Sequence, residues 1–146
     1  MRKLAAVLIL ALAGTLAHAA GPAVPAPPTF APSAIFATPS STQHFNAFAF
    51  AASPDSTTAT PGTTNLYRAS GSCPATVLLT AFAKIQTGNP PSASATAPVY
   101  DTNVVAGDVF SYVVTAVIGG KESIPSSCVT GTTPTFSPTS LTTTSN

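Results

Sequence analysis

The sequence predicts an all-β fold, a β-sandwich of about seven antiparallel strands, and three observations support this prediction. Residues 110–117 alternate between two faces, which is the side-chain period of a strand. Similar short segments recur along the chain between turn residues, and the 146 residues include fifteen prolines and nine glycines. No segment after the first twenty residues has the pattern of a helix.

The chain is organised around residues 99–117, which read as a strand, a polar corner and a long central strand. The corner spans residues 101–107 and ends in Ala-Gly, and Gly119-Gly120 ends the central strand. One face of that strand presents Phe110, Tyr112, Val114 and Ala116, and the other presents Ser111, Val113, Thr115 and Val117. We expect Tyr112 and Val114 to lie in the core between the two sheets.

Shorter apolar segments mark the remaining strands. We expect them at residues 34–37, 44–52, 65–68, 82–85 and 128–133, whereas residues 92–97 fit either an edge strand or a loop. In the second of these strands Phe48 and Phe50 share one face, and we expect both in the core together with Leu66. Residues 53–63, 69–80 and 118–127 are rich in turn formers and read as connections.

Residues 1–20 have the three parts of a secretory signal peptide. A positive start, Arg2-Lys3, precedes a nearly continuous apolar run over residues 4–16 and a small-x-small cleavage site at Ala17-His18-Ala19. That run is shorter than the roughly 20 residues needed to span a bilayer. We therefore expect a mature chain that is secreted, either extracellular or periplasmic, and that does not span a membrane.

Two segments flank the predicted domain of residues 34–134. Residues 21–33 contain five prolines, which remove amide donors, so we expect an extended leader that does not pair into a sheet along its length. Residues 135–146 are rich in Ser and Thr and poor in apolar residues, and we expect a disordered tail.

The low charge of the chain excludes one class of partner. Only 6% of the residues are charged, and after removal of the signal three cations face four carboxylates. Binding to the phosphate backbone requires several Lys or Arg residues that displace counterions. We therefore expect no nucleic-acid partner.

The ordered set of segments resembles a fibronectin type III domain of the kind common in secreted bacterial proteins. The matching segments are residues 65–70, 82–85, 99–102, 105–107, 110–117 and 122–126. On this resemblance Phe50 stands where the family usually has a core Trp, and Phe110 stands where it usually has a Tyr whose hydroxyl pins a corner. The second difference removes a hydrogen bond, so we expect a looser corner here.

The only two cysteines, Cys73 and Cys128, are expected to form a disulfide, because exported chains mature in oxidising surroundings. The bond would close a loop of about 55 residues and stabilise the fold by roughly 4 kcal/mol in the chain-entropy account. Cys73 lies in a connection that can reach the last strand. Two free thiols and an intermolecular bond are the alternatives.

No catalytic, cofactor or metal motif is present in the sequence. His44 is the only histidine after the signal, and we expect it at the surface at the start of a strand. The carboxylates that could support catalysis are Asp55, Asp101, Asp108 and Glu122. Asp101 and Asp108 flank the corner and read as turn residues. We therefore expect no enzymatic activity, no cofactor and no metal.

Three functions remain. The first is a secreted, non-catalytic module for extracellular binding or spacing, with a protein or a surface polymer bound through residues 53–63 and 118–127 at one end of the sandwich. The second is a self-associating cell-surface or fibre subunit, because few charges protect the strand edges. The third is an accessory carbohydrate-binding module, for which the chain has no Trp and only three tyrosines, Tyr67, Tyr100 and Tyr112.

Overall fold

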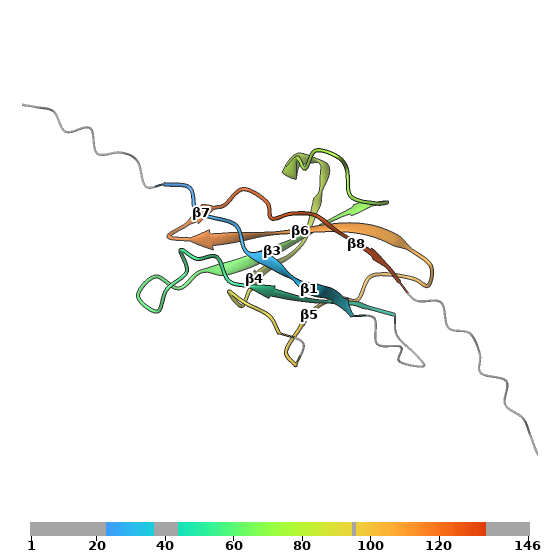
Figure 1. The fold of residues 1–146 in the computed structure, drawn as a ribbon, viewed down its shortest axis with the longest axis horizontal. Coiled ribbons are helices and arrows are strands. Elements are labelled where there is room, and N and C mark those ends of the chain that lie inside the picture. The colour runs from blue at the N-terminus through green and yellow to red at the C-terminus, as the bar shows by residue number, and fades with distance from the viewer. Residues whose placement is uncertain (1–22, 37–43, 95, 134–146) are drawn as a thin grey trace, which may run out of the picture.

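A computed structural model describes residues 23–36, 44–94 and 96–133, which form two antiparallel sheets that face each other (Figure 1). The predicted signal peptide and tail lie outside the described residues. The strands are β1 (Thr29–Phe36), β2 (Asn46–Ala51), β3 (Thr63–Ser70), β4 (Ala83–Asn89), β5 (Val99–Asp101), β6 (Val109–Ile118), β7 (Lys121–Glu122) and β8 (Val129–Thr132). A single 3-10 turn, η1 (Leu79–Ala81), precedes β4. No helix among the described residues is long and apolar enough to cross a membrane.

The smaller sheet has the strand order β1-β2-β5, and the larger sheet has the order β4-β3-β6-β7, with β8 also paired to β6. The longest pairing joins β3 to β6 without interruption, from Thr63 opposite Val117 to Ser70 opposite Phe110. All the pairings between named strands are antiparallel. The predicted all-β sandwich is therefore confirmed.

The core lies between the sheets and contains the residues that the alternation predicted. Phe50, Leu66, Tyr112 and Val114 are each at most 2% exposed. Leu66 and Val114 are direct partners across β3 and β6, and the centres of the Phe48 and Tyr112 rings lie 4.5 Å apart. The aromatic rings and the aliphatic side chains thus fill the space between the two sheets, where removal of their surface from water stabilises the fold.

The outer face of the larger sheet is also covered, which the sequence analysis did not predict. Tyr67 and Val113 form a second buried cluster there together with Phe82. Val77 and Leu79, from the connection between β3 and β4, pack against this cluster. The central strands are therefore buried on both faces, and residues 71–82 act as a cover that we call the strap.

The first strand begins earlier than predicted and corrects the interpretation of residues 21–33 as an unpaired leader. Thr29 pairs with Ala51 and Phe30 with Phe50, and after a register shift Ile35 pairs with Phe48. Pro32 falls inside this shift on an edge strand, where a missing amide donor costs little. Pro25 and Pro28 are buried as well, so the described part of the leader packs against the domain.

Two segments differ in detail from the expectation. β4 continues to Asn89, beyond the predicted end at residue 85, and Gly88 there has a positive φ of 68°. Of the two alternatives for residues 92–97, the described residues 92–94 and 96–97 form a loop with isolated bridges. Ala93, which belongs to no named strand, exchanges two backbone hydrogen bonds with Phe50 of β2, at 2.8 and 2.9 Å.

Candidate functional site

Two connections meet at one end of the sandwich, as the sequence predicted. Thr63 pairs with Val117, so the connection that precedes β3 and the one that follows β6 lie side by side. At Gly62 an added Cβ would lie only 2.8 Å from Cγ1 of Ile118, which shows how closely the two connections approach. We call this region, residues 53–63 and 118–127, the loop end.

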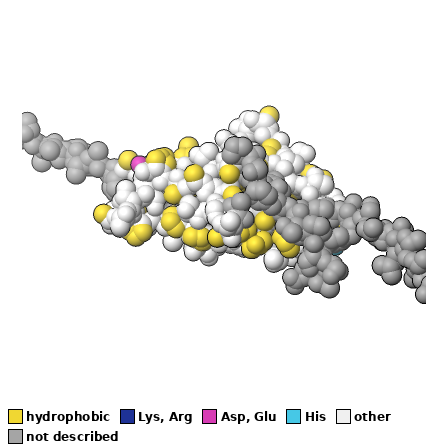
Figure 2. Space-filling view, turned by 60° about the horizontal axis from the view of Figure 1, so that its bottom comes forward, with side chains coloured by type: hydrophobic (Ala, Val, Ile, Leu, Met, Phe, Trp, Pro, Cys, Tyr) yellow, Lys and Arg dark blue, Asp and Glu magenta, His cyan; other side chains and the backbone are white. Residues whose placement is uncertain are grey.

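The Pro-rich segment joins the loop end. The Ala26 amide donates a hydrogen bond of 2.7 Å to Oδ2 of Asp55 in the first connection. Val24, in this segment, and Ile124, in the second connection, leave 61% and 64% of their surface exposed. Figure 2 shows hydrophobic side chains spread over the face that it presents, with charged side chains almost absent from view. The loop end therefore offers exposed apolar side chains, Val24 and Ile124, beside the exposed charges of Asp55 and Lys121.

The described chain leaves the domain at the opposite end. β8 ends beside the start of β6, where Thr132 pairs with Val109. The Thr133 amide then donates to the Asp108 carbonyl at 2.8 Å, and the Gly107 amide donates to the Thr133 carbonyl at 2.9 Å. In Figure 1 the described chain accordingly enters near the loop end and leaves at the far end.

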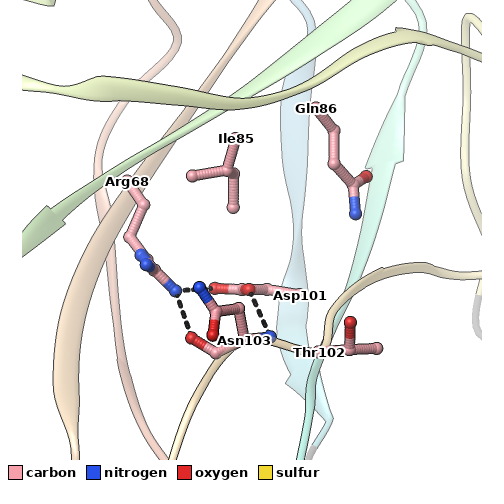
Figure 3. Close-up of a pocket in the computed structure, with 6 residues that line it drawn as sticks. All are labelled: Arg68, Ile85, Gln86, Asp101, Thr102 and Asn103. Atoms are coloured by element: carbon pink, nitrogen blue, oxygen red, sulfur yellow. Dashed lines mark hydrogen bonds and ion pairs between the residues drawn. The ribbon is translucent and has the colours of Figure 1, made fainter.

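A cavity of about 210 Å³ opens at the side of the sandwich, between the edge strands β4 and β5. It is lined by Arg68, Ile85, Gln86, Asp101, Thr102 and Asn103. In Figure 3 Ile85 and Gln86 lie on one side of it, Asp101 and Thr102 lie on the other, and Arg68 lies at one end. We call it the side pocket.

The guanidinium of Arg68 is held in place from several directions. Nη1 donates to Oδ2 of Asp101 at 2.8 Å and to the Asn103 carbonyl at 2.7 Å, and the guanidinium carbon lies 4.3 Å from the centre of the Phe110 ring. Oδ1 of Asp101 accepts from the Asn103 amide at 3.1 Å. These bonds fix the corner that follows β5.

The expectation of a looser corner is therefore wrong. Phe110 has no hydroxyl, but its ring supports Arg68, which bonds the corner directly. In addition, the hydroxyl of Tyr112 donates to Oδ2 of Asp101 at 3.0 Å and accepts from Nδ2 of Asn46 at 2.8 Å. Burial, followed by the charge and hydrogen bond of Asp101, raises the pKa of Tyr112. The neutral hydroxyl is thus the form that the fold holds.

A second polar cluster lies on the outer face of the larger sheet. Oε1 of Glu122 accepts hydrogen bonds from Asn65 at 2.8 Å, from Thr115 at 2.6 Å and from the Tyr67 hydroxyl. Nζ of Lys84 lies 3.7 Å from Oε2. Burial raises the pKa of Glu122, but the three hydrogen bonds and Lys84 outweigh it and lower the pKa to about 2. Glu122 therefore fixes β7 on the sheet as a carboxylate.

The structure joins Cys73 and Cys128 in a disulfide, with their Cα atoms 5.8 Å apart. Cys73 belongs to the strap, and Cys128 immediately precedes β8. The Cys73 amide also donates to Oγ1 of Thr130 at 3.0 Å. The bond thus fastens the strap to the last strand, across the outer face of the larger sheet.

The residues considered for catalysis each have a place in the fold. Oδ2 of Asp108 accepts from the Val105 amide at 2.9 Å, so Asp108 and Asp101 act as the turn residues that the sequence predicted. His44 lies just before β2 and is half-buried rather than fully exposed. Among the described residues, no three His, Cys, Asp or Glu side chains are grouped to hold a metal ion.

The sequence did not predict the partners of Arg68 and Glu122. Arg68 and Asp101 are 33 residues apart, and no local pattern marks their pairing. The adjacent charges Lys121-Glu122 were the only signal near the second cluster. Of the three tyrosines considered for sugar binding, Tyr67 and Tyr112 are buried, and Tyr100 is 43% exposed beside Phe45, with ring centres 5.2 Å apart.

Comparisons with known proteins support the fold. No protein-family model and no curated protein matches the chain. A crystal structure of an Fn3-like protein from Clostridium thermocellum is 23% identical, with a TM-score of 0.51, and the match covers 74% of this chain and 92% of that one.

Two human domains are similar at lower identity. The fourth FNIII domain of a human protein is 15% identical, with a TM-score of 0.53, and the match covers 85% of this chain and 91% of that one. The fibronectin type III domain of human fibronectin type III domain containing protein 3 is 17% identical, with a TM-score of 0.51 and coverage of 84% and 98%. With its strand order and its buried core, the chain folds as a fibronectin type III-like β-sandwich.

Proposed function

We propose that the chain is a secreted, non-catalytic module that binds a protein or polymer at the cell surface through its loop end. The observation that supports this most is the convergence of two connections and the Pro-rich segment at one end, with Val24 and Ile124 exposed there. Apolar residues on loops that a rigid scaffold positions are typical contact residues.

The proposal includes spacing. Because the described chain leaves beside the corner at the far end, whatever follows β8 is held one domain length away from a partner bound at the loop end. The disulfide supports an oxidising, extracytoplasmic compartment, where such bonds persist. The signal-like residues 1–20 support the same location.

Co-sedimentation with isolated cell-envelope material of the source organism tests the proposal, using the chain from residue 21 onwards. We expect Ile124→Ser to weaken binding about five- to tenfold, as the loss of an apolar anchor does. The matched control is Val105→Ser, because Val105 is 63% exposed but lies in the corner at the far end. Equal effects of the two substitutions, or no co-sedimentation of the unchanged chain, would contradict the proposal.

Self-association is the alternative that the low charge favours, and strand edges are where it would occur. The edge strand β4 has two register shifts against β3, and such irregularities disfavour pairing with another strand. We therefore expect a monomer across a concentration series in size-exclusion chromatography. A species that grows with concentration would instead favour the fibre subunit.

A further inference from the structure

We propose that the side pocket binds one unit of a neutral saccharide. This inference deepens the binding function proposed above by adding a second contact site and a ligand class. It depends on the side pocket alone and makes no use of the loop end.

The charges around the side pocket favour a neutral ligand. Its one cation, Arg68, is already paired with Asp101 at 2.8 Å, and their side chains are only 18% and 4% exposed. An anionic ligand would meet the carboxylate of Asp101, and a cationic one would meet the guanidinium, each at an energetic cost in a half-buried site. The pair therefore acts on a ligand through hydrogen bonds without a net charge.

The other polar groups that line the side pocket can form hydrogen bonds with hydroxyls. Gln86 and Asn103 carry amides, each with donors and an acceptor, and Thr102 carries a hydroxyl that does both. A saccharide hydroxyl also donates and accepts, so neighbouring hydroxyls on one ring can use such a mixed set of groups. Thr102 and Asn103 are exposed, so a ligand can reach them from solvent.

The side pocket is organised before any ligand arrives. Both hydrogen bonds of the Arg68 guanidinium leave from Nη1, and the Phe110 ring supports its plane. Gln86 donates from its amide to the Tyr100 carbonyl, which links β4 to β5 across the opening. Groups that are already fixed lose little conformational entropy on binding. This lower cost favours the binding of a ligand that makes only weak polar contacts.

The size of the side pocket limits the ligand to one ring. Its volume of about 210 Å³ lies below the roughly 300–1,000 Å³ of pockets for drug-sized molecules. Ile85 packs against the core and gives the side pocket one apolar wall, which suits the C–H face of a sugar ring. Tyr100 precedes Asp101 in β5 and is 43% exposed, so a longer chain could contact an aromatic ring nearby.

Amide chemical shifts of the isotope-labelled chain test the inference. The probes are neutral hexasaccharides of glucose, xylose, mannose and N-acetylglucosamine, with a hexasaccharide of galacturonic acid as the charged comparison. We expect at least one neutral probe to shift the amides of Gln86, Asp101, Thr102 and Asn103, while the charged probe does not. The loss of one hydrogen-bonding group in Thr102→Val should weaken that binding about five- to tenfold.

Thr87→Val is the matched control, because Thr87 is exposed on β4 but does not line the side pocket. Neither threonine lies in the core, so both variants should fold. The inference is overturned if no neutral probe shifts these amides, if only the charged probe does, or if both variants weaken binding equally. None of these results would alter the comparison of Ile124→Ser with Val105→Ser, so the two proposals can fail separately.

Discussion

The two faces of the larger sheet are both buried, but by different means. The inner face packs against a second sheet, with Leu66, Tyr112 and Val114 fully buried. The outer face is covered by the strap, a connection that contains one 3-10 turn and is fastened by a disulfide. The inner face therefore depends mainly on apolar area, whereas the outer face adds a covalent tether and polar bonds to a smaller apolar cluster.

This difference shows how a chain with 6% charged residues uses its few charges. Asp101 is paired with Arg68 beside the core, and Glu122 gathers three donors on the outer face. Both carboxylates therefore serve the fold, by holding segments together that are far apart in the sequence.

Phe48→Ala is the strongest test of the comparison, because Phe48 is fully buried between the sheets. We expect the free energy of unfolding to fall by about 3–5 kcal/mol. Phe82→Ala on the outer face should cost at least about 1 kcal/mol less, since the strap can relax into the cavity. Urea denaturation of both variants measures the difference, and equal losses would mean that the two faces are packed equally firmly.

Removing the disulfide tests the tether. We expect Cys73→Ser with Cys128→Ser to lower the free energy of unfolding by about 2–4 kcal/mol, because the unfolded chain gains freedom. Limited proteolysis should then cut the strap first, while the inner core resists until the whole domain unfolds. Alkylation followed by mass spectrometry provides the control, and two modifiable thiols in the unreduced, unchanged chain would contradict the bond.

Substitution of one tyrosine on each face compares the hydrogen bonds of the inner face with those of the outer face. Tyr112→Phe removes the acceptor of Asn46 and one donor to Asp101 in a buried site, and we expect a loss of about 1–3 kcal/mol. Tyr67→Phe should cost less, since Glu122 keeps its bonds to Asn65 and Thr115. Thermal and urea unfolding of both variants show which substitution lowers the free energy of unfolding more. A larger loss for Tyr67→Phe would contradict the expected order.

The sequence predicted the inner face well, for a physical reason. Alternation has a period of two, so residues such as Tyr112 and Val114 are assigned to one face as soon as the strand is recognised. The same rule identified Phe48 and Phe50. Burial of the other face could not be predicted this way, because Val113 is covered by a connection that has no periodic pattern of its own.

The candidate sites were harder to predict than the fold. The convergence of the two connections follows from the strand order, and the sequence predicted it. The side pocket depends on Arg68 meeting Asp101 across 33 residues and on the register of two edge strands. A leader of residues 21–33 was predicted from proline content alone, which does not reveal that an edge strand tolerates Pro32 at a register shift.

The smallest expected effect is on the pH dependence of stability, to which Glu122 contributes on the outer face. Hydrogen bonds lower the pKa of Glu122 to about 2, below its ordinary value of 4.5, so its contribution to stability is present above pH 4.5 and is lost as the pH falls towards 2. Glu122→Gln should cost about 1–2 kcal/mol at neutral pH, because the charged acceptor is lost. It should also flatten the stability profile across that acidic window.

Asp108→Asn is the control for this experiment, because it removes one carboxylate from the exposed corner at the far end. Urea unfolding of the three proteins at several pH values between neutral and about 2.5 measures the profiles. If Glu122→Gln and the unchanged chain lose stability in parallel as the pH falls, then Glu122 does not hold β7 as a carboxylate. The outer face would in that case depend on the disulfide and the strap alone, and the contrast between a tethered face and a packed face would become sharper.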